Sequence, residues 1–557
     1  MKKVGMGLGR SSHFPVLAFC LGVGLALLTF AGSAQAADEP ADQSSVSCEG
    51  LAKLALPDTT ITMAQPYAAG EFKVPSQGGP RGPGGPGGFG APGGQGGPGG
   101  TGGPGGPGGA GGPGGQANQG PSPALCRVAA TLKPTSDSDI HVEVWLPMSG
   151  WNGKLLAAGN MGWAGAIPYN GMLAPLRSGY AVAGTDTGHV GNSGAFVIGH
   201  PEKFIDYGYR GDHLMTVMAK SVITTFFGSP PKHSYWVGCS LGGEEALQEA
   251  KHYPADYDGI VAGAPVNPLS RLNAAQLWPA WVNMKNPDEA IPGPKFVFVH
   301  QAALKACASQ VGQQQGFVDD PDNCHFDPGV LLCKNGDAPD CLTVPQLDLL
   351  RKLYAGPVNP RTGESIFPGM PVGGELQWAQ DQGGAKPIGV AVDLYKYAVY
   401  QDPNWDWKTM DFDTAIARAE KETDPVLYAD PNLTDFLNHG GKLMMYIGAA
   451  EYHSFLDMEK YYNTVMQNAG PAEKDQVRLF VVDGMGHCGG GAGADTFEKL
   501  GTIDQWVETG KAPEELLSSK MAGGKTAFTR PLCAYPKVAR YKGTGDINYA
   551  VNFVCAK

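Results

Sequence analysis

Apolar and polar positions along most of the chain separate short strands from amphipathic helices. Two strands of alternating polarity come first and short apolar strands follow; the expected strands are 126–133, 140–146, 154–158, 180–184, 233–238, 259–263, 442–446 and 477–482. Residues 213–227 and 244–251 have the periodicity of helices. Strands that alternate with helices predict an α/β fold, a mostly parallel sheet flanked by helices.

This rhythm breaks between about 267 and 430, where the chain holds four cysteines and many prolines, glycines and aromatic residues. We interpret 267–430 as a lid domain over the active site. It is inserted between the two parts of a catalytic domain, 37–266 and 431–557.

The first 36 residues have the features of a secretory signal peptide. A basic start precedes an apolar run at 14–31 and a small-residue cleavage site, Ala34-Gln35-Ala36. We therefore expect cleavage near Ala36 and a secreted or periplasmic mature protein. No later stretch is long and apolar enough to span a bilayer.

The composition sets one glycine-rich stretch apart from the expected strands and helices, and the net charge argues against some classes of partner. Residues 78–120 are rich in glycine and proline and almost free of large apolar side chains, which predicts a disordered surface loop. The net charge is −12 and no basic cluster occurs, so neither nucleic acid nor a membrane is an expected partner. Nothing in the sequence indicates an oligomeric state.

The cysteine count fits an oxidising compartment. Of eleven cysteines, Cys20 leaves with the signal peptide and an even number remains. Sequence alone does not fix their connectivity. Proximity favours three pairs and leaves two, so the pairs considered are Cys307–Cys324, Cys333–Cys341, Cys533–Cys555, Cys48–Cys126 and Cys239–Cys488. None of the spacings resembles a zinc site.

Candidate chemistry begins with the motif Gly238-Cys-Ser-Leu-Gly242, which lies between an expected strand and an expected helix. It fits the Gly-x-Ser-x-Gly nucleophile elbow, a sharp turn that lifts a serine hydroxyl clear of the sheet. The alternative is a glycine-rich turn with an ordinary serine.

A second cysteine, Cys488, follows a candidate catalytic base, His487. A disulfide between Cys239 and Cys488 would hold Ser240 and His487 side by side. The alternatives are two separate buried thiols and a surface histidine.

These motifs and several others resemble the tannase/feruloyl esterase family, which includes mono(2-hydroxyethyl) terephthalate hydrolase. The matching stretches are Trp151–Lys154, Gly159–Gly165, Gly179–His189, Gly238–Gly243, Tyr253–Pro265 and Gly484–Cys488. The resemblance covers most of the chain after residue 45 except the glycine-rich stretch. It implies an α/β-hydrolase fold with a large inserted lid, and a disulfide between the cysteines beside the nucleophile and the base.

The resemblance also implies a mechanism. Ser240 would attack an ester carbonyl while His487 accepts its proton. The backbone N–H of Leu241 would be one oxyanion-hole donor, and Met161 or Gly162 would supply the second.

The acid of the triad departs from the family pattern. The turn that normally carries an aspartate reads Gly448-Ala-Ala-Glu451 here, so Glu451 is the expected acid. A glutamate is one methylene longer and can still orient the histidine. The rival acids are Asp457 and Asp483.

The calcium loop of the family's lid is the second departure. Residues 307–321 align with it, but carboxylates are missing at Ala308, Val311 and Gln315. Calcium requires several hard oxygen ligands. We therefore expect no metal and no other cofactor, with Cys307–Cys324 holding the loop instead.

The family's substrates are gallate, hydroxycinnamate and terephthalate-monoester types. An aromatic acyl group needs a flat apolar wall in its binding site. The candidates are Trp378, Trp405, Trp407 and Phe412, and the alternative is that these residues only form the core of the lid. Asp186 and His189 either belong to the site or brace its loop.

The sequence therefore predicts a secreted serine esterase that hydrolyses small aromatic esters. Two alternatives stay open. One is a serine hydrolase for a non-aromatic ester or a lactone, and the other is a binding protein with a decayed triad.

Overall fold

The computed structural model describes residues 46–75, 120–382 and 386–557. The expected signal peptide at 1–36 and the glycine-rich stretch up to residue 119 lie outside the described residues.

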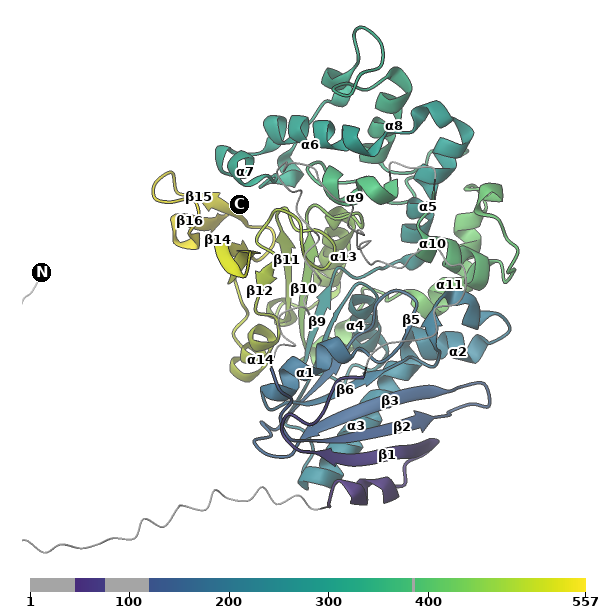
Figure 1. The fold of residues 1–557 in the computed structure, drawn as a ribbon, viewed down its shortest axis with the longest axis vertical. Helices are drawn as coiled ribbons and strands as arrows, with labels where there is room; N and C mark the ends of the chain where they lie inside the picture. Colours follow the sequence, from purple (N-terminus) through teal and green to yellow (C-terminus); the bar gives the residue numbers. More distant parts are fainter. Residues whose placement is uncertain (1–45, 76–119, 383–385) are drawn as a thin grey trace, which may run out of the picture. The chain divides into compact units, whose positions relative to one another are not determined.

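A nine-stranded sheet forms the centre of the fold, with strand order β1-β2-β3-β6-β4-β8-β9-β10-β11 (Figure 1). Its strands are β1 (Thr59–Tyr67), β2 (Leu125–Leu132), β3 (Ile140–Pro147), β4 (Lys154–Ala158), β6 (Ala181–Thr185), β8 (His233–Cys239), β9 (Gly259–Gly263), β10 (Lys442–Gly448) and β11 (Val477–Val482). The pairs from β1 to β6 are antiparallel and those from β6 to β11 are parallel. The expected α/β-hydrolase fold, with its mostly parallel sheet, is confirmed.

Strand β1 has no counterpart among the expected strands. It lies at the edge of the sheet, most of its side chains are exposed or half-buried, and its register with β2 shifts between Ile61 and Met63. A strand that is not buried on either face carries little hydrophobic periodicity.

Alternate residues of the parallel strands enter two different cores, one on each face of the sheet. Leu155 packs in one core and Leu156 in the other, as the two-residue period of a strand requires. The helices that supply the first core are α3 (Gly211–Phe227), α4 (Leu241–His252), α12 (Thr434–Asn438) and α13 (Phe455–Asn468). The second core receives α1 (Tyr169–Arg177) and α14 (Leu500–Thr509).

Residues 267–430 contribute no strand to the large sheet. Their helices, drawn in teal and green in Figure 1, are α5 (Leu269–Lys285), α6 (Gly293–Cys307), α7 (Gln310–Gln315), α8 (Val344–Ala355), α9 (Glu375–Gln382), α10 (Gly389–Asp393) and α11 (Ala415–Leu427). A third core joins them, and it also includes Trp163 and Leu241. The insertion therefore packs on the two loops that carry the candidate nucleophile and oxyanion donors; its role as a lid stays a prediction.

The C-terminal segment adds two small antiparallel sheets. One contains β12 (Thr496–Phe497), β13 (Glu515–Ala522) and β14 (Lys525–Cys533), and the other β15 (Val538–Tyr541) and β16 (Phe553–Ala556). None of these strands was expected. Two short strands, β5 (Ala164–Gly165) and β7 (Gly191–Asn192), pair with each other in a separate antiparallel sheet.

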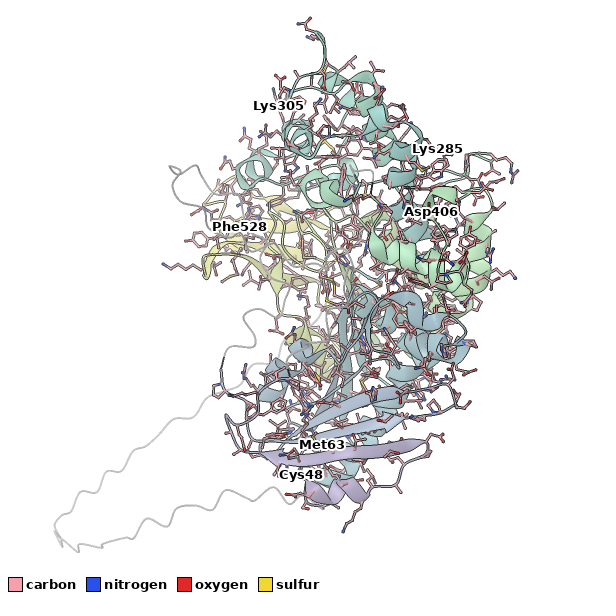
Figure 2. The ribbon with its side chains drawn as sticks, turned by 45° about the vertical axis from the view of Figure 1, so that its right-hand side comes forward. Cys48, Met63, Lys285, Lys305, Asp406 and Phe528 are labelled. Atoms are coloured by element: carbon pink, nitrogen blue, oxygen red, sulfur yellow. A yellow bond between two sulfur atoms is a disulfide. The ribbon has the colours of Figure 1, made fainter. Side chains whose placement is uncertain are left out.

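Among the described residues there are five disulfides, and they join the five pairs considered from the sequence: Cys48–Cys126, Cys239–Cys488, Cys307–Cys324, Cys333–Cys341 and Cys533–Cys555. Cys48 lies next to the edge strand β1, which carries Met63 (Figure 2). Across the described ranges, no helix is long and apolar enough to cross a membrane.

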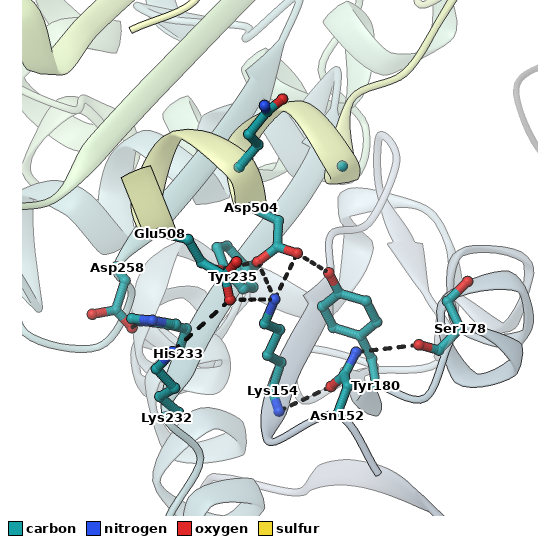
Figure 3. A network of polar contacts seen from close by, with 12 residues as sticks. Asn152, Lys154, Ser178, Tyr180, Lys232, His233, Tyr235, Asp258, Asp504 and Glu508 are labelled. Atoms are coloured by element: carbon teal, nitrogen blue, oxygen red, sulfur yellow. Dashed lines mark hydrogen bonds and ion pairs between the residues drawn. The ribbon is translucent and has the colours of Figure 1, made fainter. Parts of the chain in front are cut away.

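A partly buried network of ion pairs and hydrogen bonds joins β4 and β8 to α14 (Figure 3). Lys154 Nζ lies 2.7 Å from Asp504 and 2.9 Å from Glu508. The hydroxyls of Tyr235 and Tyr180 donate to Asp504 over 2.6 and 3.0 Å. Burial acts to raise the pKa of Asp504, but the hydrogen bonds from Lys154 and the two tyrosines outweigh it and lower the pKa.

Asp504→Asn is expected to lower the free energy of unfolding at neutral pH by about 2 kcal/mol, because Lys154 loses a charged partner. Since the pKa of Asp504 is lowered on folding, its contribution is fully present above the ordinary value of 3.8 and disappears as the pH falls through the folded value. Denaturant unfolding of both proteins across the acid range measures this. A stability difference that persisted or grew in acid would contradict the assignment. Glu508→Gln, at the more exposed partner, is the milder control.

Candidate active site

Ser240 occupies the turn between β8 and α4. Its backbone has φ 62° and ψ −122°, a left-handed conformation that costs about 1–3 kcal/mol in a residue with a side chain. The flanking backbones pack so closely that only glycine fits. A Cβ on Gly238 would lie 2.1 Å from the Gly242 carbonyl oxygen, and one on Gly243 would lie 2.2 Å from that of Gly263. This is the geometry of a nucleophile elbow.

Glu451 and His487 meet across two turns that follow neighbouring parallel strands, β10 and β11. His487 Nδ1 lies 2.6 Å from Glu451 Oε2. The Glu451 side chain is completely buried, and burial raises the pKa of its carboxyl, while the charge and hydrogen bond of His487 partly offset the rise. The longer glutamate side chain therefore does reach the histidine.

The disulfide between Cys239 and Cys488 joins the turn of Ser240 to the turn of His487. It links residues 249 apart in sequence, and their Cα atoms are 6.0 Å apart. Within the described ranges, no hydrogen bond joins the Ser240 hydroxyl to His487; catalytic hydrogen bonds are often long without substrate. The bridge nevertheless places the two residues on adjoining turns.

The loop after β4 lies against the start of α4. Asn160 is its anchor: its carbonyl accepts from the Gly242 amide over 2.8 Å, and its own amide donates to Glu245 Oε2 over 2.8 Å. Met161 and Gly162 follow directly, and Leu241 is the first residue of the helix. In the part of the chain that the structure describes, the amides of Leu241, Met161 and Gly162 donate to no acceptor. They are free to bind an oxyanion.

Glu245 therefore holds the candidate oxyanion loop from beneath the elbow. It is buried in the first turns of α4, and burial raises its pKa to about 7, while hydrogen bonds from Asn160 oppose the rise. The sequence analysis did not single it out.

Asp457 and Asp483, the rival acids, do not bond to His487. Burial raises the pKa of Asp457 to about 7 and that of Asp483 to about 8. Both environments favour the uncharged acid, whereas Glu451 contacts the histidine directly.

Asp186 and His189 brace loops. Asp186 accepts from the ring and the backbone amide of His141 over 2.6 and 2.8 Å, and His189 Nε2 is 3.1 Å from the Trp163 carbonyl. Among the aromatic candidates, Trp378 and Phe412 are fully buried in the core of the insertion, whereas Trp405 and Trp407 are half-buried.

A histidine that the sequence analysis missed, His453, lies two residues after Glu451. Its ring packs edge-on against that of His487, with centroids 4.3 Å apart. Burial lowers its pKa well below the ordinary value, the charge of His487 lowers it further, and a backbone hydrogen bond with Ala264 opposes both. Its position in the sequence, two residues after the expected acid, could have identified it as a candidate site residue.

The aligned calcium loop is filled by protein contacts. Asp319 accepts from the Ser309 amide over 2.9 Å, and Asp320 pairs with Arg540 at 2.5 Å. Gln315 accepts a hydrogen bond from the guanidinium of Arg530. A positively charged side chain therefore occupies the neighbourhood where the alignment expects a carboxylate.

Comparison with known proteins agrees with the fold. The family described as "Tannase and feruloyl esterase" matches residues 126–556. The chain is 34% identical over 487 residues to an uncharacterized esterase of Xanthomonas campestris, covering 78% of this chain and 84% of the relative. It is 32% identical over 453 residues to a probable feruloyl esterase B-2 of Aspergillus terreus, covering 77% and 85%.

The crystal structure of feruloyl esterase B from Aspergillus oryzae superposes with a TM-score of 0.78 at 26% identity, covering 91% of this chain and 99% of that one. The protein belongs to the tannase/feruloyl esterase family and is a carboxylic ester hydrolase.

Replacing Cys239 and Cys488 together by serine is expected to cost up to about 5 kcal/mol of stability, because the bridge closes a very long loop. The same change at Cys333 and Cys341, which closes a short loop, should cost about half as much and leave ester hydrolysis intact. Thermal unfolding and the rate on a p-nitrophenyl ester measure the two effects. Full activity of the Cys239/Cys488 variant at a temperature where it is folded would show that the bridge does not align the site.

Proposed function

We propose that the protein is a secreted serine esterase that hydrolyses esters of aromatic carboxylic acids. One observation carries the proposal: the turn of a strained serine in a nucleophile elbow is joined by the Cys239–Cys488 disulfide to the turn of His487, and that histidine is bonded to a buried carboxylate. An elbow serine, a base and an acid that orients the base are the parts that acyl transfer requires.

In the first half-reaction, Ser240 Oγ bonds to the ester carbonyl carbon and its proton passes to His487. The carbonyl oxygen becomes an oxyanion, which the amides of Leu241 and of Met161 or Gly162 stabilise. Collapse of this intermediate breaks the bond to the alcohol, which leaves with the proton from His487. Water then attacks the acyl-enzyme by the same route and releases the acid.

Glu451 keeps the His487 ring in position and stabilises its cation. The bond to Nδ1 leaves Nε2 as the nitrogen that takes the serine proton. Because the carboxyl is fully buried, the charge it carries acts on the imidazolium with little screening by water.

The names of the relatives indicate the acyl group of the substrate. The relatives from Aspergillus are named feruloyl esterases, which favours an aromatic acid such as a hydroxycinnamate, gallate or terephthalate monoester. A small aromatic ester is thus the proposed partner of the site.

The proposal also includes export of the protein and a lid loop without calcium. Five disulfides and the signal-like sequence at 1–36 support export to an oxidising compartment. The contacts of Asp319, Asp320 and Gln315 support a loop that holds no calcium. Stoichiometric calcium in chelator-washed protein would overturn this last point.

Hydrolysis of an ester panel tests the function. Methyl ferulate, methyl gallate, a terephthalate monoester and a p-nitrophenyl acetate are offered to protein produced in an oxidising compartment. At least one aromatic ester should be hydrolysed, and Ser240→Ala should reduce the rate by about a thousandfold or more. Turnover of p-nitrophenyl acetate alone would point to a non-aromatic ester or lactone. No serine-dependent turnover, with no labelling by a serine-directed phosphonate, would leave a decayed binding protein.

Glu451→Gln should lower kcat about 1,000- to 10,000-fold, because the neutral amide neither stabilises the imidazolium nor enforces the ring tautomer. Asp457→Asn is the matched control at the nearby rival acid and should stay within a few-fold of wild type. Steady-state kinetics on the best ester of the panel measure both. Near-wild-type kcat in Glu451→Gln, or a large loss in Asp457→Asn, would reassign the acid.

A further inference from the structure

The triad leaves one buried histidine beside it without a task. His453 is only 5% exposed and follows Glu451 in the same turn, and its ring touches that of His487. Acyl transfer needs one histidine, so the second calls for a physical explanation.

Two buried atoms of this group have no hydrogen-bond partner: Glu451 Oε1 and His453 Nδ1. Glu451 bonds to His487 through its other oxygen, Oε2. Nearly all buried polar atoms in proteins are paired, and a carboxylate oxygen and an imidazole lone pair are both electron-pair donors. Neither can satisfy the other without a cation or a proton between them.

The donors converge because the backbone holds their turns together. Ala450 donates to the Met485 carbonyl over 3.0 Å, and a Cβ on Gly448 would lie 2.3 Å from the same oxygen. Ser454 ends the turn in a left-handed conformation, with φ 60°. One ligand atom from each of Glu451, His453 and His487 lies within 4.8 Å of the others.

Two imidazoles and one carboxylate form a donor set that suits zinc. Zinc–ligand bonds of about 2.0–2.2 Å in a tetrahedron put ligand atoms about 3.3 Å apart, so side-chain adjustments of about an ångström close the site. The hydrogen bond between the Ala264 backbone and the His453 ring is the kind of outer contact that orients a metal-binding histidine.

We propose that Glu451, His453 and His487 form a binding site for a divalent transition-metal ion, zinc above all, and that its occupation switches the esterase off. A metal bound to His487 and Glu451 ties up the base that accepts the serine proton and the carboxylate that stabilises the resulting imidazolium. Copper(II) has the same preference for imidazole, whereas calcium and magnesium require more oxygen ligands than this site offers. Zinc binding at this site does not depend on the proposed esterase function. Only the inhibition by zinc rests on that function.

Zinc binding is measured first on chelator-treated Ser240→Ala protein, full length and disulfide-bonded, by calorimetric titration. We expect one zinc per chain and no comparable heat with calcium. Adding His453→Asn should weaken zinc binding at least about tenfold. The matched control, His439→Asn, changes an exposed histidine and should leave the affinity unchanged. Equal affinity in both variants, or no zinc binding at all, overturns the proposal.

Two further measurements keep the test decisive. Cobalt(II) bound to protein with an intact His453 should give the intense visible bands of a four-coordinate ion, and weak octahedral bands would contradict the site even if His453→Asn failed to fold. Zinc should suppress hydrolysis of the best ester of the panel and a chelator should restore it, whereas the ratio of rates with and without zinc should stay near one in His453→Asn. Zinc binding without inhibition would reject the switch alone, and an inactive wild type that still binds zinc would reject the proposed function alone.

Discussion

Backbone crowding around Ser240 is the constraint on which the rest of the site depends. The left-handed turn is sustained because Gly238 and Gly243 allow the strand, the helix and the neighbouring strand to touch without side chains between them. Strain of this kind persists only where the surroundings over-determine the conformation. Here they include a nine-stranded sheet with an apolar core on each face.

The site is then assembled from turns at the same edge of that sheet. The turns after the carboxyl ends of β4, β8, β10 and β11 carry Asn160, Ser240, Glu451 and His487, the residues to which the proposed function gives the roles of oxyanion loop, nucleophile, acid and base. Backbone contacts join adjacent turns in pairs, with Asn160 bonded to Gly242 and Ala450 bonded to Met485. The inserted residues 267–430 pack against Leu241 at this edge, so the packing of the insertion and the position of the elbow are linked.

Local chemistry was readable from the sequence, and long-range burial was not. Gly-x-Ser-x-Gly specifies a local strand-turn-helix, so the strand before Ser240 and the helix after it were predicted in the right place. The edge strand β1 was missed because its side chains are not alternately buried. His453 and Glu245 are buried by segments that are distant in the sequence. The local pattern of apolar and polar residues does not indicate such contacts.

Because the Cys239–Cys488 bridge needs oxidising conditions to form, the geometry of the site depends on the compartment as well as on the sequence. Free thiols persist in a reducing compartment, so a chain there would carry every catalytic residue without the bond that fixes the two turns to each other. Under the proposed function, the maturation of activity would then require an oxidation step, which disulfide-forming machinery outside the cytosol would supply. If the bridge aligns the site, an esterase built this way would stay inactive toward the producing cell's own esters until it met an oxidising compartment.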